Sequence, residues 1–436
     1  MRLVALILAL TCYALAQELT LESAIRLALE NNHLLKASKR EVKAQELELM
    51  SARGALFPRI KLEETFTRTD IPAFAFMSKL NQERMGLQDF DPSRLNNPSA
   101  VNNFETKLSL EVPIWMGGKV QSAIRMANYE YRAVSLQDIR REEEIIKEVY
   151  NAYANAVYAK ASIDVARQGV KDAQEHLRLA ENMHKVGMAL LSDVLRAKVY
   201  LSKAEENLQK AQRGYETAKK GLELLLGKPL GEFEVKDLGA CPQVEKEPYI
   251  QKALQRADIR ATQERLKVLE ESYRFVLSDN LPQIYAFANY SLYSKNFPFG
   301  SDGSGYMVGL GISWSFDTGL STLRKAQANL ERKRALEEQL SFLRNRALFE
   351  VEKAYREYLN ALDELKSAQD RIRASEEVVR VMELRYKNGL ARIVDLLDAQ
   401  TELDKARFEK VQALKACHTA YAELLFASGS IREVLP

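Results

Sequence analysis

Apolar and small residues recur along much of the chain at alternating steps of four and three, the spacing of one face of a packed helix. In the second half they form two series: Leu336, Leu340, Leu343, Ala347, Ala354, Tyr358, Ala361, Leu365, Ala368, Ile372, and then Leu396, Ala399, Leu403, Ala406, Ala413, Cys417, Ala420, Leu424. No proline lies between Pro113 and Pro229 or between Pro298 and Pro436, so two very long helical regions are allowed. A helix from Leu320 to Lys387 would be on the order of 100 Å long. The pattern predicts long helices in coiled-coil packing.

The helical pattern occurs twice. Gly187 and Gly389 each interrupt a long helical stretch and mark a sharp turn between two helices. Asp193 and Asp395 follow these turns at the same offset (389 − 187 = 395 − 193 = 202). A constant offset over equivalent features indicates an internal duplication.

Two clean stretches of alternating apolar and polar or small residues lie between the helices, at 104–114 and 306–316. Each has about the length of a transmembrane β-strand. Weaker partner strands fit Arg59–Thr69 and Gln283–Ser294, which predicts one β-hairpin in each repeat. Four aromatic residues of the later partner strand suit an interfacial girdle: Tyr285, Phe287, Tyr290 and Tyr293.

The loops of the two hairpins differ. The first, roughly Ile71 to Asn103, is long and polar, and Pro92 and Pro98 predict irregular structure in it. The second, Asn296 to Gly305, is short. The long loop could cover one mouth of a barrel.

The strand and helix patterns together predict the domain order. It is a signal peptide at 1–16, a first repeat at 17–227, an equatorial linker at 228–249, a second repeat at 250–430 and a tail at 431–436. Within the repeats, β-hairpins are expected at about 59–115 and 283–317, and helical hairpins at about 118–227 and 319–428.

The four strands constrain the assembly. An open sheet edge in lipid leaves backbone groups unpaired, so a barrel in a membrane must close. Four strands per chain are too few, because barrels of this kind begin at about eight strands, and an eight-stranded barrel is filled by side chains. We therefore expect a symmetric oligomer larger than a dimer.

The N-terminus predicts export from the cytoplasm. Arg2, a short apolar run and Ala14-Leu15-Ala16 are typical of a signal peptide that is cleaved after Ala16. Cys12 lacks the preceding residues expected before a lipidated cysteine. The net charge of +3, with both signs interspersed, does not indicate nucleic acid.

The remaining cysteines predict no disulfide framework. Only Cys241 and Cys417 follow the signal peptide, so we expect packing to supply the stability, with Cys417 as a small core residue.

With these features the chain resembles the TolC-like outer-membrane efflux family over essentially its whole mature length. The resemblance rests on the repeat architecture, on the two turns, and on Val112-Pro113-Ile114-Trp115-Met116-Gly117-Gly118 at a strand-to-helix junction. It implies a mainly α fold with a β-barrel portion, as a homotrimer whose chains share a twelve-stranded barrel in the outer membrane and a long α-helical tunnel in the periplasm. It also implies a passive duct that works with a periplasmic adaptor and an inner-membrane pump, without a cofactor.

The resemblance also implies an aperture at the periplasmic end. The family's two acidic residues, three apart, are matched by Asp395 and Asp398. That spacing places both carboxylates on one helix face, so three chains would stack two acidic rings that attract cations. Such rings would raise each other's pKa. Arg196 stands at the equivalent of Asp398 (398 − 202 = 196), and a plain solvated helix face remains the alternative.

Two further sets of residues follow from the resemblance. A latch at the tip would join Tyr386 and Arg392 to Ser192 and Asp193, although helix capping explains the last two equally well. The exposed turns are candidates for adaptor contact: Val186, Gly187, Met188, Asn388, Gly389 and Leu390.

Other classes of protein fit the sequence less well. The histidines show no spacing of a zinc site, and Gly117-Gly118 lacks the lysine of a phosphate loop, so an enzyme is not expected. A porin would be mostly strand, and an adaptor would have one hairpin. The alternative function is a soluble periplasmic coiled-coil protein with a structural or adaptor role.

Overall fold

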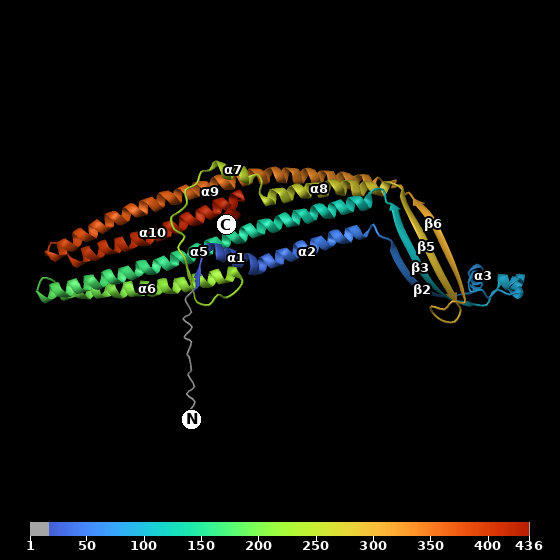
Figure 1. The fold of residues 1–436 in the computed structure, drawn as a ribbon, viewed down its shortest axis with the longest axis horizontal. Coiled ribbons are helices and arrows are strands. Elements are labelled where there is room, and N and C mark those ends of the chain that lie inside the picture. The colour runs from blue at the N-terminus through green and yellow to red at the C-terminus, as the bar shows by residue number, and fades with distance from the viewer. Residues whose placement is uncertain (1–16, 436) are drawn as a thin grey trace, which may run out of the picture. The chain divides into compact units, whose positions relative to one another are not determined.

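The computed structural model describes residues 17–435. The predicted signal peptide and Cys12 lie outside the described residues. The longer helices are α1 (Leu21–Asn31), α2 (His33–Gly54), α3 (Pro72–Asn81), α5 (Lys119–Lys185), α6 (Leu191–Leu226), α8 (Ala257–Leu277), α9 (Ser321–Lys387) and α10 (Ile393–Ser428). Short helices are α4 (Pro92–Asn96) and α7 (Glu247–Ala253), and the strands are β1 (Gln17–Leu19), β2 (Arg59–Thr69), β3 (Val101–Trp115), β4 (Phe233–Val235), β5 (Gln283–Ser294) and β6 (Gly303–Ser313). The predicted mainly helical fold with strand pairs is confirmed (Figure 1).

The chain forms two compact units, each built from segments far apart in sequence. Among the described residues, the hairpin unit holds 17–41, Ser135–Ala261 and 340–435. The sheet unit holds Val42–Val134 and Thr262–Gln339.

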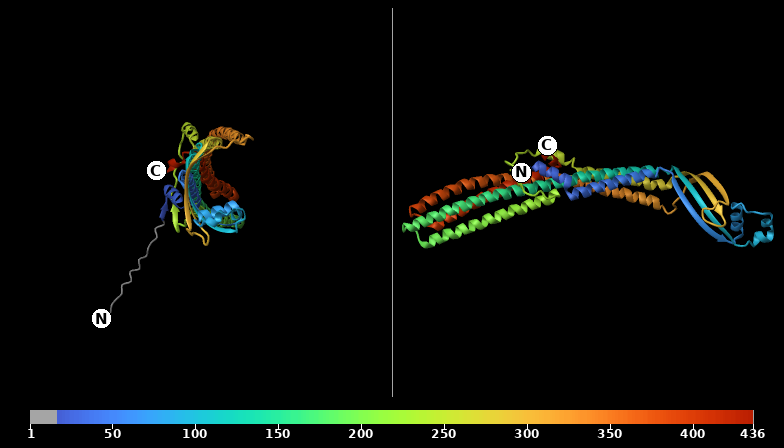
Figure 2. Two further views of the ribbon diagram at one scale, coloured as in Figure 1. Left: turned by 90° about the vertical axis from the view of Figure 1, so that its right-hand side faces the viewer. Right: turned by 60° about the horizontal axis from the view of Figure 1, so that its bottom comes forward.

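Two helical hairpins dominate the hairpin unit, and their helices match to the residue. Helices α5 and α9 each have 67 residues, and α6 and α10 each have 36. The offset of 202 holds at both ends of α5 and α9 (321 − 119 = 387 − 185 = 202). The paired helices appear in green for α5 and α6 and in orange to red for α9 and α10 (Figure 2). Gly227 and Gly429, both at positive φ, end α6 and α10 as left-handed caps.

The predicted seams lie in the core of this unit. Ala347, Tyr358 and Ala368 of α9 are almost fully buried, as are Leu396 and Leu403 of α10. Small side chains at many of these positions let the helix backbones approach closely. The seam thus explains why α9 and α10 stay helical despite an abundance of charged residues on their outer faces.

A belt of mixed structure closes the end of the hairpins away from the turns. Strand β1 pairs in parallel with β4, which comes from the linker between the repeats. The hydroxyl of Tyr153, on α5, donates to the carbonyl oxygen of Leu19 at 2.7 Å and ties this small sheet to the hairpin. Ile25, Leu222 and Leu226 pack in the same buried cluster.

The belt also corrects the expectation for the cysteines. Cys241 of the linker and Cys417 of α10 form a disulfide, with Cα atoms 6.2 Å apart. Cys417 is a core residue, as expected, but it is not merely a small apolar one. The two cysteines are 176 residues apart, and no local pattern shows that the linker passes beside α10.

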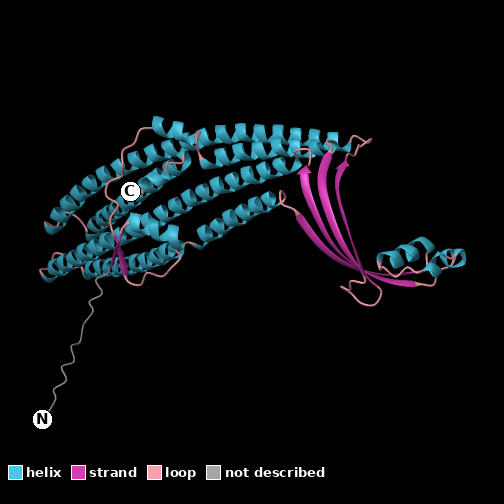
Figure 3. Cartoon of the chain, turned by 45° about the vertical axis from the view of Figure 1, so that its right-hand side comes forward, coloured by secondary structure: helices cyan, strands magenta, loops and turns pink. Residues whose placement is uncertain are grey.

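The sheet unit contains a four-stranded antiparallel sheet in the order β2-β3-β5-β6. Figure 3 shows the four strands twisting together, with the small helices α3 and α4 near one end. The register brings apolar residues of all four strands to one face: Ile60, Leu62, Phe66, Phe104, Leu108, Leu110, Ala288, Tyr290, Val308 and Leu310. Many of them are well exposed, with Val308 at 71% and Leu310 at 74%. The opposite face carries Lys61, Glu63, Glu105, Lys107 and Ser109.

The aromatic girdle is wrong for three of its four residues. Only Tyr290 lies on the apolar face. Tyr285, Phe287 and Tyr293 lie on the polar face, with Tyr293 opposite Glu105. Tyr285 lies across Gly311, where an added Cβ would come within 2.4 Å of the ring. The aromatic rings thus cover strand glycines, which offer no side chain of their own to pack against.

Two element boundaries also differ from the prediction. Strand β6 ends at Ser313, so Trp314 and Phe316 continue the alternation beyond the strand. The long loop is not wholly irregular, because it contains α3 and α4. Pro72 and Pro92 stand in the first turn of these helices, where proline costs no hydrogen bond. Among the described residues, no helix is both long and apolar enough to cross a membrane.

Candidate functional site

The tips of the two helical hairpins have the same turn. Gly187 and Gly389 take positive φ values of 78° and 70°. The amide of Met188 donates to the carbonyl of Met183 at 2.8 Å, and the equivalent bond from Leu390 to Arg385 is also 2.8 Å. These bonds satisfy the last carbonyls of α5 and α9, so each turn is sharp and well defined.

The aspartates after the turns both cap their helices. Asp193 accepts the backbone N–H of Leu190 at 3.2 Å, and Asp395 accepts that of Arg392 at 3.0 Å. This is the alternative that the sequence left open for Asp193. Capping explains why an acidic residue is retained at this position in both repeats, independently of any pore.

Asp395 has an additional partner that Asp193 lacks. The guanidinium of Arg392 lies 3.0 Å from its carboxylate. The side-chain hydrogen bond from Arg392, followed by the backbone N–H, holds the pKa of Asp395 below its usual range. Within one chain the pKa shift of Asp395 is thus opposite to the one expected from stacked acidic rings, because the hydrogen bonds from Arg392 outweigh the effect of burial.

Asp398 is the more exposed carboxylate of the pair. It lies one helical turn beyond Asp395, on the same face of α10, and makes no ion pair with any of residues 17–435. Its charge is therefore less offset than that of Asp395, which forms an ion pair with Arg392.

The four predicted latch residues lie at the tips, but one chain does not bring them all together. Arg392 bonds Asp395 of its own helix, and Ser192 is exposed. The ring of Tyr386 is 4% exposed and packs with Ile393. Burial, and secondarily the charge of Asp193, raises the pKa of Tyr386.

The Tyr386 hydroxyl itself is buried and has no hydrogen-bond partner in the described part of the chain. Leaving a buried hydroxyl without a hydrogen-bond partner costs about 1–3 kcal/mol. Among the four latch residues, Tyr386 is therefore the one with a buried polar group that a single chain leaves without a partner.

The turns expose a group of large apolar side chains. Val186 is 68% exposed, Met188 56% and Leu390 69%, while Gly187 and Gly389 are also open to solvent. Asn388 donates its side-chain amide to the carbonyl of Leu384 at 2.8 Å, so it closes α9 in place of an apolar residue. The turn of the first hairpin is thus the more apolar of the two.

A buried polar cluster joins the two hairpins several turns from the tips, and the sequence did not reveal it. His176 of α5 bonds Gln400 of α10 at 3.1 Å, and the Gln400 amide donates to Asp172 at 3.1 Å. Arg407 of α10 donates to Asp172 at 2.7 Å. His176 and Gln400 are 6% and 2% exposed. A polar pair at a core position of two long helices is the signal that could have suggested this contact.

Helix α6 completes this inter-hairpin cluster. The Tyr200 hydroxyl donates to Asp404 of α10 at 2.7 Å. Burial raises the pKa of Asp404, against the opposing effect of the Tyr200 hydrogen bond. The cluster fixes one alignment of the first hairpin against the second, because each of its buried groups is satisfied only in that alignment.

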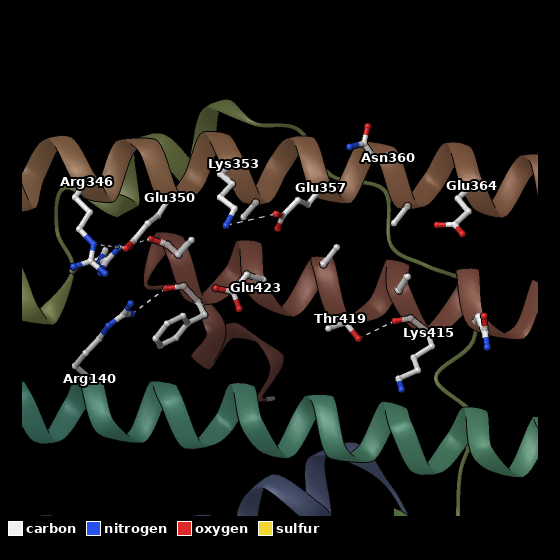
Figure 4. Close-up of a pocket in the computed structure, with 18 residues that line it drawn as sticks. Arg140, Arg346, Glu350, Lys353, Glu357, Asn360, Glu364, Lys415, Thr419 and Glu423 are labelled. Carbon is white, nitrogen blue, oxygen red and sulfur yellow. Dashed lines mark hydrogen bonds and ion pairs between the residues drawn. The ribbon is translucent and has the colours of Figure 1, made fainter. Parts of the chain in front are cut away.

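A groove of about 1140 Å³ runs beside α5, α9 and α10 in the hairpin unit. Figure 4 shows charged side chains of both signs along it, including Arg140 on α5, Glu350 on α9 and Lys415 on α10. Arg346 pairs with Glu350 at 2.8 Å. Within residues 17–435, no group of three or more His, Cys, Asp and Glu side chains is placed to hold a metal. The groove is thus lined by charged side chains of both signs.

The comparison with protein families decides the class of protein. The family model described as "Outer membrane efflux protein" matches residues 24–228 and 249–430, which is most of the chain.

The chain belongs to the outer membrane efflux protein family.

Known relatives support this assignment. The probable efflux pump outer membrane protein SepC of Pseudomonas putida is 24% identical over 399 residues, covering 88% of this chain and 77% of that protein. Outer membrane protein TolC of Escherichia coli is 31% identical over 108 residues, which is 25% of this chain and 22% of TolC. The crystal structure of the transmembrane channel CusC has the same fold, with a TM-score of 0.81 at 16% identity, over 94% of this chain and 92% of that one.

This outer membrane efflux protein is thus an outer-membrane channel component of an efflux system. The family consists of ducts, not enzymes. The hairpin tips and the four-stranded sheet are the two places where the fold has chemistry suited to that task. The inter-hairpin cluster and the disulfide are the features that sequence reasoning missed.

Proposed function

We propose that three copies of this chain close a twelve-stranded barrel in the outer membrane and continue as a helical duct in the periplasm. The proposal rests mainly on the sheet. Among residues 17–435 its edge strands β2 and β6 are unpaired on their outer sides, and one of its faces is mainly apolar, with Glu64 bonded there by the Thr106 hydroxyl. Lipid tolerates such strands only in a closed barrel. Three copies supply twelve strands and leave room for a lumen lined by the polar face.

In this assembly the hairpin tips form the periplasmic aperture. Asp395 and Asp398 of three chains would form two acidic rings on α10 that favour cations. Because Arg392 offsets Asp395, the ring of Asp398 carries more of the selectivity. Arg196 at the equivalent place on α6 supports a role for the second hairpin alone.

A latch between neighbouring copies would hold the aperture shut. Arg392 and the unpartnered hydroxyl of Tyr386 would then exchange bonds with Asp193 and Ser192 of the adjacent hairpin. Such charge-assisted bonds are strong when dry and are readily replaced by water or by a protein partner.

The duct works with an adaptor and an inner-membrane pump, and the exposed turns are the proposed adaptor contact. Val186, Met188 and Leu390 present apolar surface beside glycines that let another backbone come close. Exposed apolar groups of this kind mark sites of protein association.

Single-channel recording in planar bilayers tests the aperture. Purified protein should give a small, cation-selective conductance, and the Asp395→Ala/Asp398→Ala variant should lose most of that selectivity. Glu181→Ala is the matched control, because it removes an exposed carboxylate near the end of α5 that belongs to neither the rings nor the latch, and it should leave selectivity in place. Unchanged selectivity in the double variant, or an equal loss in the control, would show that the rings are not the constriction.

A further inference from the structure

The loop between β2 and β3 is a built segment, not a simple connection. It spans residues 70–100 and holds α3, a 3-10 turn at Leu87–Phe90, and α4. Strand β2 enters the sheet from α2 and leaves it toward α3, so this segment lies at the end of the sheet opposite to α2 (Figure 3). The corresponding connection between β5 and β6 is only residues 295–302.

The exposed face of α3 is apolar, which reverses the usual arrangement. Ala75 and Ser78 face inward, whereas Phe74 is 63% exposed, Met77 49% and Leu80 46%. The one charged residue of α3, Lys79, forms an ion pair with Asp89 of the same loop at 2.8 Å. A soluble surface helix normally turns such residues inward, so this face has the composition of a contact surface.

The segment is fixed to the polar face of the sheet. The amide of Gln82, which is 1% exposed, donates to the side chain of Asn103 at 2.8 Å and to the carbonyl of Asn102 at 2.9 Å. Asn103 lies on the same face of β3 as Glu105 and Lys107. At Gly303 an added Cβ would lie 2.1 Å from the carbonyl oxygen of Asn81, so the end of α3 is pressed against β6.

We propose that α3 is part of a cap over the outer mouth of the channel, in which its apolar face packs against α3 of the neighbouring copies. This inference rests on the proposed trimer. Lipid would lie against the apolar face of the barrel, whereas Gln82 holds the segment to the polar face, which encloses the lumen. At that place the α3 helices of the other two chains offer the matching apolar surface.

Cross-linking tests the contact. In Met77→Cys, a short bis-maleimide added to intact cells should join two chains covalently, because residues near a threefold axis meet their own copies. The native Cys241 and Cys417 are joined to each other and do not compete. Ser99→Cys, an exposed position of the same segment outside α3, is the control and should give no such product. A trimer of the Met77→Cys variant that does not cross-link overturns the cap.

Access to the lumen gives an independent test that the periplasmic aperture does not affect. Ser109 lies on the polar face of β3, and a bulky maleimide should label Ser109→Cys slowly from the cell exterior. Adding Phe74→Asp/Met77→Asp should speed this labelling roughly tenfold, because charges destroy an apolar contact. Ser99→Asp should not.

Fast labelling of Ser109→Cys alone, or no change with the α3 charges, contradicts the cap. If the purified protein is not a trimer, the proposed function fails, and the cap fails with it. If it is a trimer and only these two assays fail, the channel stands without a cap.

Discussion

At the residue scale, the disulfide is the strongest single constraint in the belt. It holds the linker against α10 beside Tyr358, whose hydroxyl bonds the carbonyl of Pro242. Because it closes a long stretch of chain, its loss should lower the free energy of unfolding by about 2–5 kcal/mol. Thermal unfolding of Cys241→Ser/Cys417→Ser, followed by circular dichroism, measures this. An unchanged midpoint, or two free thiols in the unreduced native protein, would contradict the bond.

His418, next to the disulfide, makes the belt sensitive to acid. Its ring is buried, bonding the Tyr150 hydroxyl at 3.0 Å and the Gly239 carbonyl at 3.3 Å, and Asp237 also acts on it. Burial lowers the pKa of His418, against the opposing effect of Gly239. The unfolded chain therefore binds a proton more readily, and stability falls as the pH drops below about 6.5.

The pH test compares unfolding midpoints at about pH 7.5 and pH 5. Wild type should lose more stability on acidification than His418→Gln, which keeps a polar side chain but cannot take up the proton. The same loss in both proteins would show that another group is responsible.

At the element scale, what could be foreseen from sequence was the part that depends on near neighbours. The start of α5 at Lys119 and the turns at Gly187 and Gly389 follow from periodicity and from glycine's tolerance of positive φ. Contacts between distant segments could not be foreseen, because nothing near His176 specifies that Gln400 will face it. The prediction of the face on which Tyr285 lies was wrong for a related reason. That face depends on packing of its ring over Gly311 in the next strand.

The inter-hairpin cluster yields a prediction at this scale. Arg407→Ala would leave the carboxylates of Asp172 and Asp404 without their cation in a largely buried place, at a cost of about 1–3 kcal/mol. Hydrogen exchange should show lost protection in α5 and α10 around these residues.

Arg371→Ala is the control for that experiment. Arg371 pairs with Glu409 at 3.1 Å between α9 and α10, within one hairpin, and both side chains are at least a third exposed. Its removal should cost less than about 1 kcal/mol. Equal effects of the two substitutions would mean that the cluster does not hold the hairpins together.

At the scale of the whole molecule, the candidate aperture and the oligomer could be predicted from the sequence, whereas the exposed apolar face of α3 could not. Asp395 and Asp398 were found from the resemblance, and the structure adds that Arg392 weakens the first of them. The need for several copies of the chain to close a barrel could be predicted from the number of strands alone. The exposed apolar face of α3 could not be predicted, because the sequence of this segment is typical of a loop. The contact between Gln82 and Asn103, which fixes the segment, joins residues of different elements.

The most direct test of the account is the number of chains in the purified complex. Native mass spectrometry of the protein extracted in mild detergent should find three copies, because only then do the free edges of β2 and β6 close into a barrel of twelve strands. A well-folded monomer or dimer that remains stable in the membrane extract would contradict the closed barrel, and with it the duct.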